Sequence, residues 1–330
     1  MKVVVTGCQG FIGSHLCDEL LSNGYSVMGL DDCSKYGKIE RKHDNHPEFT
    51  FLETNIVKCQ ITPRLGPCFK DIDVWVSAAG EVYGTRYYDK RSYDALQANA
   101  RILTTETELA IKLFKEYQVK RQIVLSGSEV FENADTFPTT EASLKNILAP
   151  VSTYGFQTLL REYITKSAYE QYQLPYTIIR PSNCIGTGIN HATGKVNKFV
   201  LPDLINKTLQ GQDPLHILGS GNQVRCFTDV KDVVRGIRLA IENEAAINED
   251  FNISTSQTTT ILELAQLVWK EINGDKPFNY ISDEPPTYDI QKRIPDVTKA
   301  KQILGFEATT PLHDSIKQVI TYINKLDKNK

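Results

Sequence analysis

The chain has 330 residues, of which 41% are hydrophobic and 23% are charged, and its 37 basic and 40 acidic residues give a net charge of −3. This composition is that of a soluble globular protein with one large or two modest domains. The balanced charge, without a long basic block, argues against a nucleic-acid partner, and no stretch approaches the ~20 apolar residues of a membrane span. We therefore expect a cytoplasmic protein that binds neither nucleic acid nor a membrane.

The seven cysteines are odd in number, scattered along the chain and without a Cys-x-x-Cys pair. This pattern argues against a disulfide framework and against a zinc site. Reduced, mostly buried thiols and the absence of a bound metal are the expectation.

The first predicted element is a short β-branched strand that ends at Thr6, and a helix is predicted to begin with Phe11 and Ile12. Gly7 and Gly10 lie between the two elements, and Gly13 lies in the first turn of the helix. Gly7 allows a sharp bend, Gly10 a close approach of the backbone to a pyrophosphate, and Gly13 close packing of the helix on the strand. The amides at the start of the helix add donors and partial positive charge. The sequence therefore predicts a phosphate-binding turn.

A second apolar strand, residues 25–30, ends in Asp31 and Asp32, about 20 residues after the turn. An acidic side chain at this place accepts hydrogen bonds from an adenosine ribose in dinucleotide-binding folds. The alternative interpretation is an ordinary strand-helix turn followed by two surface acids. Spacing, strand context and acid agree, so we predict a bound NAD.

Further predicted strands and helices alternate along the chain, with strands at residues 49–54, 74–79, 122–126 and 176–180 and helices at residues 95–117 and 154–172. This alternation predicts an α/β fold with a doubly wound parallel sheet and ligands at the carboxyl ends of its strands. The small residues Ala78 and Ala79 at one strand end would let a cofactor lie close, although tight packing of two elements explains them equally well.

Beyond residue 181 the chain becomes rich in Gly and Asn, which indicates a second region. We predict that residues 1–181 form the NAD-binding domain and that residues 226–254 rejoin it. Residues 182–225 and 255–330 are then expected to form a smaller C-terminal α/β region that binds the substrate.

Several motifs together resemble the extended short-chain dehydrogenases/reductases that act on nucleotide sugars. They are the opening glycine turn with Asp31, Leu125-Ser126-Gly127-Ser128-Glu129-Val130-Phe131, Tyr154-Gly155, Arg180-Pro181-Ser182-Asn183, and segments 218–233 and 291–300. The resemblance implies that NAD transiently oxidises a sugar carbon, usually C4, of a nucleotide-diphosphate sugar. It also implies a homodimer, in which the helices that begin near residues 95 and 154 form an intermolecular four-helix bundle.

The resemblance assigns binding roles to several positions of this sequence. Asp31 holds the adenosine ribose, and Asn55 with Ile56 contacts the adenine. Arg225 and Arg293 match arginines around the nucleotide diphosphate, a task suited to the guanidinium fork, although a surface salt bridge is the alternative for either one. Asn183 matches a substrate-contacting asparagine of the family, and the alternative is that it only shapes a turn.

The expected proton-transfer groups are incomplete. Tyr154 matches the tyrosine that removes the sugar hydroxyl proton, but Thr158 stands where the family has lysine and Gly127 where it has Ser or Thr. Free tyrosine titrates near pH ~10, so without a nearby positive charge only about 0.1% is ionised at pH 7. Ser126 and Ser128 flank the glycine, and a bulge at the strand end would present either hydroxyl in its place.

Glu129 aligns with the glutamate base of sugar 4,6-dehydratases, and a structural carboxylate is its alternative role. Its surroundings are also similar to those of UDP-glucuronate decarboxylases. His191, a lone loop histidine, is not predicted to be catalytic. The leading prediction is an NAD-dependent nucleotide-sugar epimerase or dehydratase that uses Tyr154, Glu129 and one of the two serines. The alternatives are a UDP-glucuronate decarboxylase-like enzyme and a catalytically impaired NAD and nucleotide-sugar binding protein.

Overall fold

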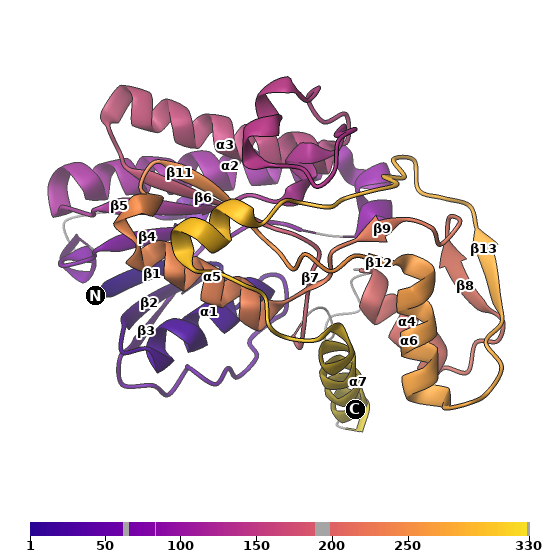
Figure 1. Ribbon diagram of the computed structural model, residues 1–330. Coiled ribbons are helices and arrows are strands. Elements are labelled where there is room, and N and C mark those ends of the chain that lie inside the picture. The colour runs from indigo at the N-terminus through magenta and orange to yellow at the C-terminus, as the bar shows by residue number, and fades with distance from the viewer. Residues whose placement is uncertain (62–65, 83, 189–198, 329–330) are drawn as a thin grey trace.

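The protein folds around a parallel β-sheet with helices on both of its faces, as Figure 1 shows. The computed structural model describes residues 1–61, 66–82, 84–188 and 199–328. Seven strands lie in the order β11-β6-β5-β4-β1-β2-β3, and every neighbouring pair is parallel. Their bounds are β1 (Lys2–Thr6), β2 (Ser26–Asp31), β3 (Phe49–Glu53), β4 (Val74–Ser77), β5 (Arg121–Leu125), β6 (Tyr176–Pro181) and β11 (Glu249–Ile253). The predicted α/β class with a doubly wound parallel sheet is confirmed.

Two pairs of helices cover this sheet. On one face α1 (Phe11–Ser22) packs against α5 (Val230–Glu242), and on the other α2 (Thr85–Tyr117) packs against α3 (Thr153–Tyr172) (Figure 1). Because both faces are covered, the central strands contain continuous apolar runs instead of alternating residues, and Val3 to Val5 are fully buried. The topology places the carboxyl ends of all seven strands along one edge, which is where ligands bind in such sheets.

Two of the boundaries predicted above move by more than one residue, each for a local reason. The strand predicted at residues 74–79 ends at Ser77, because the amides of Ala78 and Ala79 both donate to the Thr6 hydroxyl instead of continuing the ladder. The helix predicted from residue 95 begins at Thr85 and continues across a non-helical residue, Arg91, which breaks the regular periodicity of the first turns.

A smaller group of elements lies beside the sheet, at the right of Figure 1, around a second core. It contains three helices and several short strands, namely β7 (Cys184–Ile185), α4 (Val200–Leu209), β8 (Leu215–Leu218), β9 (Val224–Arg225), β10 (Thr228–Asp229), β12 (Thr259–Thr260), α6 (Ile261–Asn273), β13 (Tyr280–Asp283) and α7 (Leu312–Lys328). The strand β11 pairs with β6 and is the last strand at that side of the large sheet. Ala300, Leu304 and Phe306 pack into the core of the large sheet, although they lie within residues 255–330, which were expected to belong to the second region.

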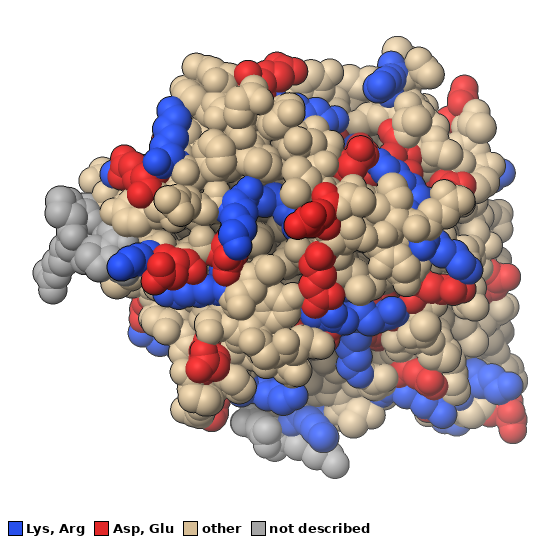
Figure 2. Space-filling view, turned by 60° about the vertical axis from the view of Figure 1, so that its left-hand side comes forward, with Lys and Arg blue, Asp and Glu red and all other residues tan. Residues whose placement is uncertain are grey.

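The remaining helical turns are short. They are η1 (Ile56–Lys58), η2 (Gly66–Phe69), η3 (Ser128–Phe131), η4 (Glu141–Asn146), η5 (Glu244–Ala246) and the π-helical η6 (Ala300–Leu304). Basic and acidic side chains are interspersed over the face shown in Figure 2. Among the described helices, none combines the length and the apolar character needed to cross a membrane.

Candidate active site

A cavity of about 1120 Å³ runs along the carboxyl ends of the central strands and on into the smaller region. At one end it is lined by the glycine turn after β1, in the middle by the start of α3, and at the other end by Arg225 and Arg293. Its volume is above the ~300–1,000 Å³ usual for a site that holds one small ligand. Its lining extends from the glycine turn to the two arginines, so different kinds of residue surround its two ends.

The glycine turn has the tight geometry that the sequence predicts. Gly7 has a φ of +66°, and a Cβ atom on it would lie 2.9 Å from the Ala79 Cα. A Cβ atom on Gly13 would lie 2.1 Å from the Gly7 carbonyl oxygen, so no other residue fits without moving α1 away from the turn. At Gly10 the same oxygen would be 3.0 Å away, and the Gly10 amide donates to it at 2.9 Å.

The acid pair fastens this turn to the neighbouring strand. The Asp31 carboxylate accepts the amides of Gln9 at 2.9 Å and Cys33 at 2.8 Å, and burial raises its pKa. Asp32 accepts the Ser34 amide at 3.0 Å and the Asn55 side-chain amide at 2.7 Å. These bonds hold the turn, the loop after β2 and the segment after β3 around one end of the cavity.

Ile56 and the small residues of the neighbouring strand end complete this part of the cavity. Ile56 is buried and begins η1 directly after Asn55. Ala78 and Ala79 line the cavity beside the glycine turn. Phe11 and Ile12 line it from the start of α1. The structure thus brings all predicted cofactor-binding residues to one cavity.

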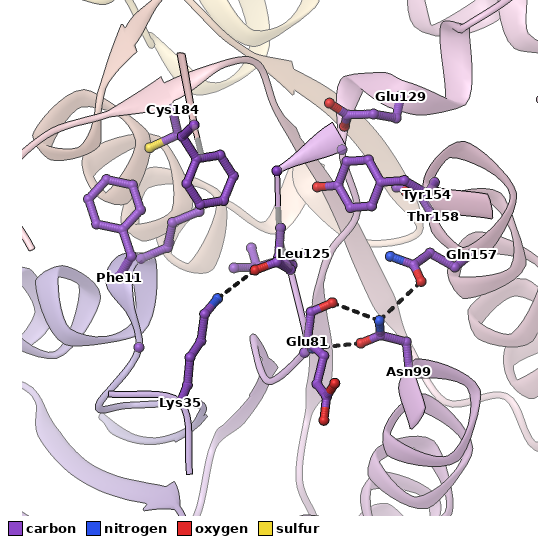
Figure 3. Close-up of a pocket in the computed structure, with 18 of the residues that line it drawn as sticks. Phe11, Lys35, Glu81, Asn99, Leu125, Glu129, Tyr154, Gln157, Thr158 and Cys184 are labelled. Atoms are coloured by element: carbon purple, nitrogen blue, oxygen red, sulfur yellow. Dashed lines mark hydrogen bonds between the residues drawn. The ribbon is translucent and has the colours of Figure 1, made fainter. Parts of the chain in front are cut away.

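Tyr154 and Glu129 point into the same part of the cavity, as Figure 3 shows. Thr158 lies one helical turn after Tyr154, but its hydroxyl donates to the Tyr154 carbonyl oxygen at 2.6 Å and is turned toward its own helix. A Cβ atom on Gly127 would lie 2.5 Å from the Glu129 Oε2 atom. The Glu129 carboxylate therefore fills the space that a Ser or Thr side chain at position 127 would need.

The two serines that flank Gly127 have different surroundings. Ser126 lines the cavity, and its hydroxyl donates to the Glu162 carboxylate at 2.7 Å. Ser128 is fully buried, lies off the cavity and has no hydrogen-bond partner for its hydroxyl within the described part of the chain. The reason is local, since η3 begins at Ser128 and turns that side chain inward while it presents Glu129 to the cavity.

The arginines predicted at the diphosphate lie side by side at the far end of the cavity. Arg293 donates to the Glu129 carboxylate at 2.6 Å and forms a partly buried ion pair with it. Arg225 donates to the Ile290 carbonyl at 2.6 Å, and burial together with the nearby Arg293 lowers its pKa to about 9. Asn183 lines the cavity between these arginines and the glycine turn, with a φ of 39°.

The comparisons with known proteins agree with this geometry. Residues 3–254 match the model of the NAD dependent epimerase/dehydratase family. The chain belongs to this family. It is 30% identical to a crystal structure of UDP-glucose 4-epimerase with UDP-glucose from Thermotoga maritima, with 99% of each chain covered and a TM-score of 0.84.

Two further relatives indicate the range of the family. The structure of UDP-glucuronic acid 4-epimerase from Bacillus cereus in complex with UDP-glucuronic acid and NAD is 25% identical, with 99% of this chain and 100% of that chain covered and a TM-score of 0.82. UDP-glucuronic acid decarboxylase 1 of Xenopus tropicalis is also 25% identical, with 98% of this chain and 73% of the relative covered. The predicted enzyme class, an NAD-dependent nucleotide-sugar epimerase or dehydratase, and NAD as its cofactor are confirmed.

This epimerase/dehydratase family member carries site residues that sequence patterns did not reveal. Lys35 points into the cavity, as Figure 3 shows. Its ammonium donates to the Val82 carbonyl at 2.8 Å, and burial lowers its pKa to about 8. The Asn99 side chain accepts a hydrogen bond from the Glu81 amide and donates to the Glu81 carbonyl and to the Gln157 side-chain oxygen. For Lys35 the local signal is its position shortly after Asp31 and Asp32, whereas Asn99 lies inside a long helix without a local signal.

Beneath the cofactor end lies a second unpredicted group, made of Thr6, Glu106 and Arg161. The Thr6 hydroxyl accepts the amides of Ala78 and Ala79 and donates to the Glu106 carboxylate. Arg161 donates to the carbonyls of Ser77, Leu125 and Ala79 at 3.4, 3.2 and 3.0 Å. These three residues come from β1, α2 and α3, so only the fold brings them together.

Other predictions fall outside what the structure describes. His191 and most of the Gly- and Asn-rich stretch that follows Asn183 lie outside the described residues. Within the described ranges, no group of three His, Cys, Asp or Glu side chains is placed to hold a metal ion.

Proposed function

We propose that the protein is a UDP-sugar 4-epimerase in which Tyr154 takes the proton of the sugar C4 hydroxyl. When bound, NAD supplies the oxidant by accepting a hydride from C4 and later returning it. The observation that supports this proposal most directly is the placement of Tyr154 and Glu129 in the same cavity as the glycine turn and Asp31. We choose UDP as the nucleotide because the relatives described above are named as enzymes of UDP-sugars.

The residues around the cavity fit NAD at one end. The close contacts of Gly7 and Gly13 leave the amides at the start of α1 accessible for a pyrophosphate. Asp31 would accept the hydroxyls of the adenosine ribose, and Asn55 with Ile56 would border the adenine. Ala78 and Ala79, which lack bulky side chains, would let the rest of the dinucleotide lie along the ends of β1 and β4.

At the other end, Asn183, Arg225 and Arg293 would hold the nucleotide diphosphate and orient the sugar toward Tyr154. Arg293 then has two possible anionic partners, the diphosphate and Glu129, to which it donates at 2.6 Å. A substrate that draws Arg293 away would release the Glu129 carboxylate. Glu129 would act as the second proton-accepting group, in the space that Gly127 leaves open.

A decarboxylase acting on UDP-glucuronate is the second candidate. The ion pair of Glu129 with Arg293 favours it, because a guanidinium at this place can hold the carboxylate of a uronic acid. An NAD- and sugar-nucleotide-binding protein without turnover remains the third, because neither Thr158 nor Gly127 supplies a proton-transfer group.

We also propose that the protein is a cytoplasmic homodimer joined through α2 and α3. Tyr163 and Phe156 on α3 are 65% and 45% exposed, and Tyr93 on α2 is 75% exposed. Neighbouring exposed aromatic side chains are typical of a surface that a partner covers. Light scattering of the purified protein tests the dimer, and Tyr163→Asp with Phe156→Asp is expected to give a monomer.

One experiment separates the candidate functions. The purified protein is denatured, the released dinucleotide is identified by mass spectrometry, and the native protein is offered UDP-glucose, UDP-N-acetylglucosamine and UDP-glucuronate in turn under NMR. The 4-epimer of any of these supports the epimerase, and carbon dioxide with a pentose product supports the decarboxylase. Bound NAD without any product supports the binding protein.

Tyr154→Phe is the matched control. It removes one oxygen atom from the cavity, keeps the aromatic ring, and is expected to keep the bound NAD. Turnover should fall about 10²- to 10⁴-fold, the usual contribution of a general base. Undiminished turnover in Tyr154→Phe would refute the proposed role of Tyr154.

A further inference from the structure

The position four residues after Tyr154, where its proposed role calls for a positive charge, is uncharged in this chain. That position is Thr158, whose hydroxyl bonds to the Tyr154 carbonyl oxygen. A neutral threonine cannot favour the phenolate over the phenol, whose pKa is ordinarily near ~10. Any positive charge that the protein adds to that of an oxidised nicotinamide ring must therefore come from another residue.

Arg161 is placed to do so. It follows Tyr154 by seven residues, so both lie on the same face of α3 together with Thr158. Side chains on a helix lean toward its N-terminus, which brings the long arm of Arg161 back toward Tyr154. The guanidinium lines the cavity, where three strand-end carbonyls fix it between β4 and β5.

Glu106 is the counter-charge of this arginine. Its side chain is fully buried under the ends of β1 and β4, where the Thr6 hydroxyl donates to it. Burial raises the pKa of Glu106 to about 7, and the positive charge of Arg161 opposes that rise. The two groups therefore interact electrostatically across the floor of the cavity, and neither is explained by packing of an apolar core.

We propose that Arg161 supplies a positive charge that favours ionisation of Tyr154, and that the negative charge of Glu106 partly cancels this effect. This inference rests on the proposed function, in which Tyr154 is the base. Arg161 acts through Tyr154 and is a positioning residue, not a catalytic one. Seven residues rise ~10 Å along a helix, and one charge at about that separation in a medium of effective dielectric ~20 shifts a pKa by about one unit, a tenfold change in the ionised fraction.

Other charged groups also face this part of the cavity. Glu81 comes from the segment after β4, Glu129 from η3, Lys35 from the loop after β2, and Arg293 from the C-terminal segment. Arg293 is paired with Glu129, and the backbone of Glu81 is held by the Asn99 side chain. The test therefore changes Arg161 and Glu106 one at a time and leaves these four groups in place.

The readout is the titration of the Tyr154 phenol in the NAD-bound protein. Tyrosine labelled with carbon-13 at Cζ gives a signal that follows ionisation, and Tyr154→Phe identifies the signal among the 15 tyrosines. Arg161→Met is expected to raise the Tyr154 pKa by about one unit, and Glu106→Gln to lower it by a similar amount. Lys166→Met, which removes a half-exposed charge from the same helix, should leave it unchanged.

A double variant that moves the positive charge from position 161 to position 158 gives a second, independent test. Thr158→Lys combined with Arg161→Met places the positive charge one turn nearer Tyr154 and is expected to restore or lower its pKa. Thr158→Met with Arg161→Met is the neutral control and should show no recovery. Arg161→Lys, which keeps the charge, should keep most of the effect.

A purely structural role for Arg161 gives a different pattern. Arg161→Met would then lower the unfolding temperature without moving the Tyr154 titration, and Thr158→Lys would not rescue it. That result overturns the proposal, as does a shift of the same sign in Arg161→Met and Glu106→Gln. If Arg161→Met does not fold, Glu106→Gln and Arg161→Lys still decide, because the proposal requires Glu106→Gln to lower the Tyr154 pKa and Arg161→Lys to leave it nearly unchanged. Absence of NAD from the wild-type protein would contradict the proposed function instead.

Discussion

The two ends of the cavity are built in different ways. At the cofactor end the close contacts are made by backbone atoms, where a Cβ atom on Gly13 would lie 2.1 Å from the Gly7 carbonyl oxygen. At the proton-transfer end the contacts are made by side chains, where the Glu129 carboxylate fills the space above Gly127. Backbone contacts allow one residue type, whereas a site made of side chains can obtain the same charge or hydroxyl from another position. Substitutions should therefore be far more damaging at the first end than at the second.

Gly13→Ala is expected to have the largest effect. The added methyl group cannot avoid the Gly7 carbonyl, so α1 must move away from the turn and bound NAD should be lost. Unfolding by urea, with the dinucleotide content measured by mass spectrometry, should show a loss of about 3 kcal/mol or more and no retained NAD. Gly24→Ala is the control. An added Cβ atom there has no atom within 4 Å, so the only cost is the strain of alanine at a φ of +79°, about 1 kcal/mol. A Gly13→Ala protein that keeps its NAD would show that the backbone contact is dispensable.

This difference also explains how much could be predicted from sequence. The turn with Gly7, Gly10 and Gly13 and the acid Asp31 were predictable, because a backbone requirement leaves glycine at fixed spacing. The same holds for the parallel sheet, whose buried strands are continuous apolar runs such as residues 3–5.

The rest of the site was not predictable because its partners come from distant segments. Glu106 lies in the middle of a long helix and Arg161 two turns after Tyr154, and no spacing rule connects either with the cofactor turn. The two serines beside Gly127 were equivalent in sequence, and only the start of η3 at Ser128 separates the one that lines the cavity from the one that does not.

Glu106 should make stability depend on pH. Burial raises its folded-state pKa from 4.5 to about 7, so the folded protein binds more protons than the unfolded chain between these values. Stability is then complete below pH ~4.5, falls as pH rises to about 7 and is constant above, with a total loss of roughly 3 kcal/mol. Glu106→Gln should remove this loss. Urea unfolding of both proteins at intervals from pH 5 to pH 8 measures the difference, and parallel curves would contradict it.

Gly127→Thr tests the proton-transfer end, where side chains can adjust. The new Cβ atom would lie 2.5 Å from the Glu129 Oε2 atom, so the carboxylate must shift and its ion pair with Arg293 should weaken. We expect a loss of about 1–2 kcal/mol in stability, the usual cost of mild overpacking. Adding Glu129→Ala should recover part of it, which a double-mutant cycle measures as a coupling between the two positions. Additive effects would show that the two side chains do not compete for space.

Loss of the Lys35 charge is expected to have the smallest effect, and it tests the cofactor end of the cavity. Its ammonium lies in the cavity, and because burial lowers its pKa to about 8, it loses its positive charge as pH rises through that value. The pyrophosphate of NAD is anionic, so NAD affinity should fall about two- to tenfold between pH 7 and pH 9, in proportion to one weakly screened charge. Lys35→Met should bind NAD as weakly at pH 7 as the wild type does at pH 9, with little further change. Fluorescence titration with NADH measures both. A wild-type affinity that does not change with pH would mean that a side chain, too, can be dispensable at the end where the backbone makes the close contacts.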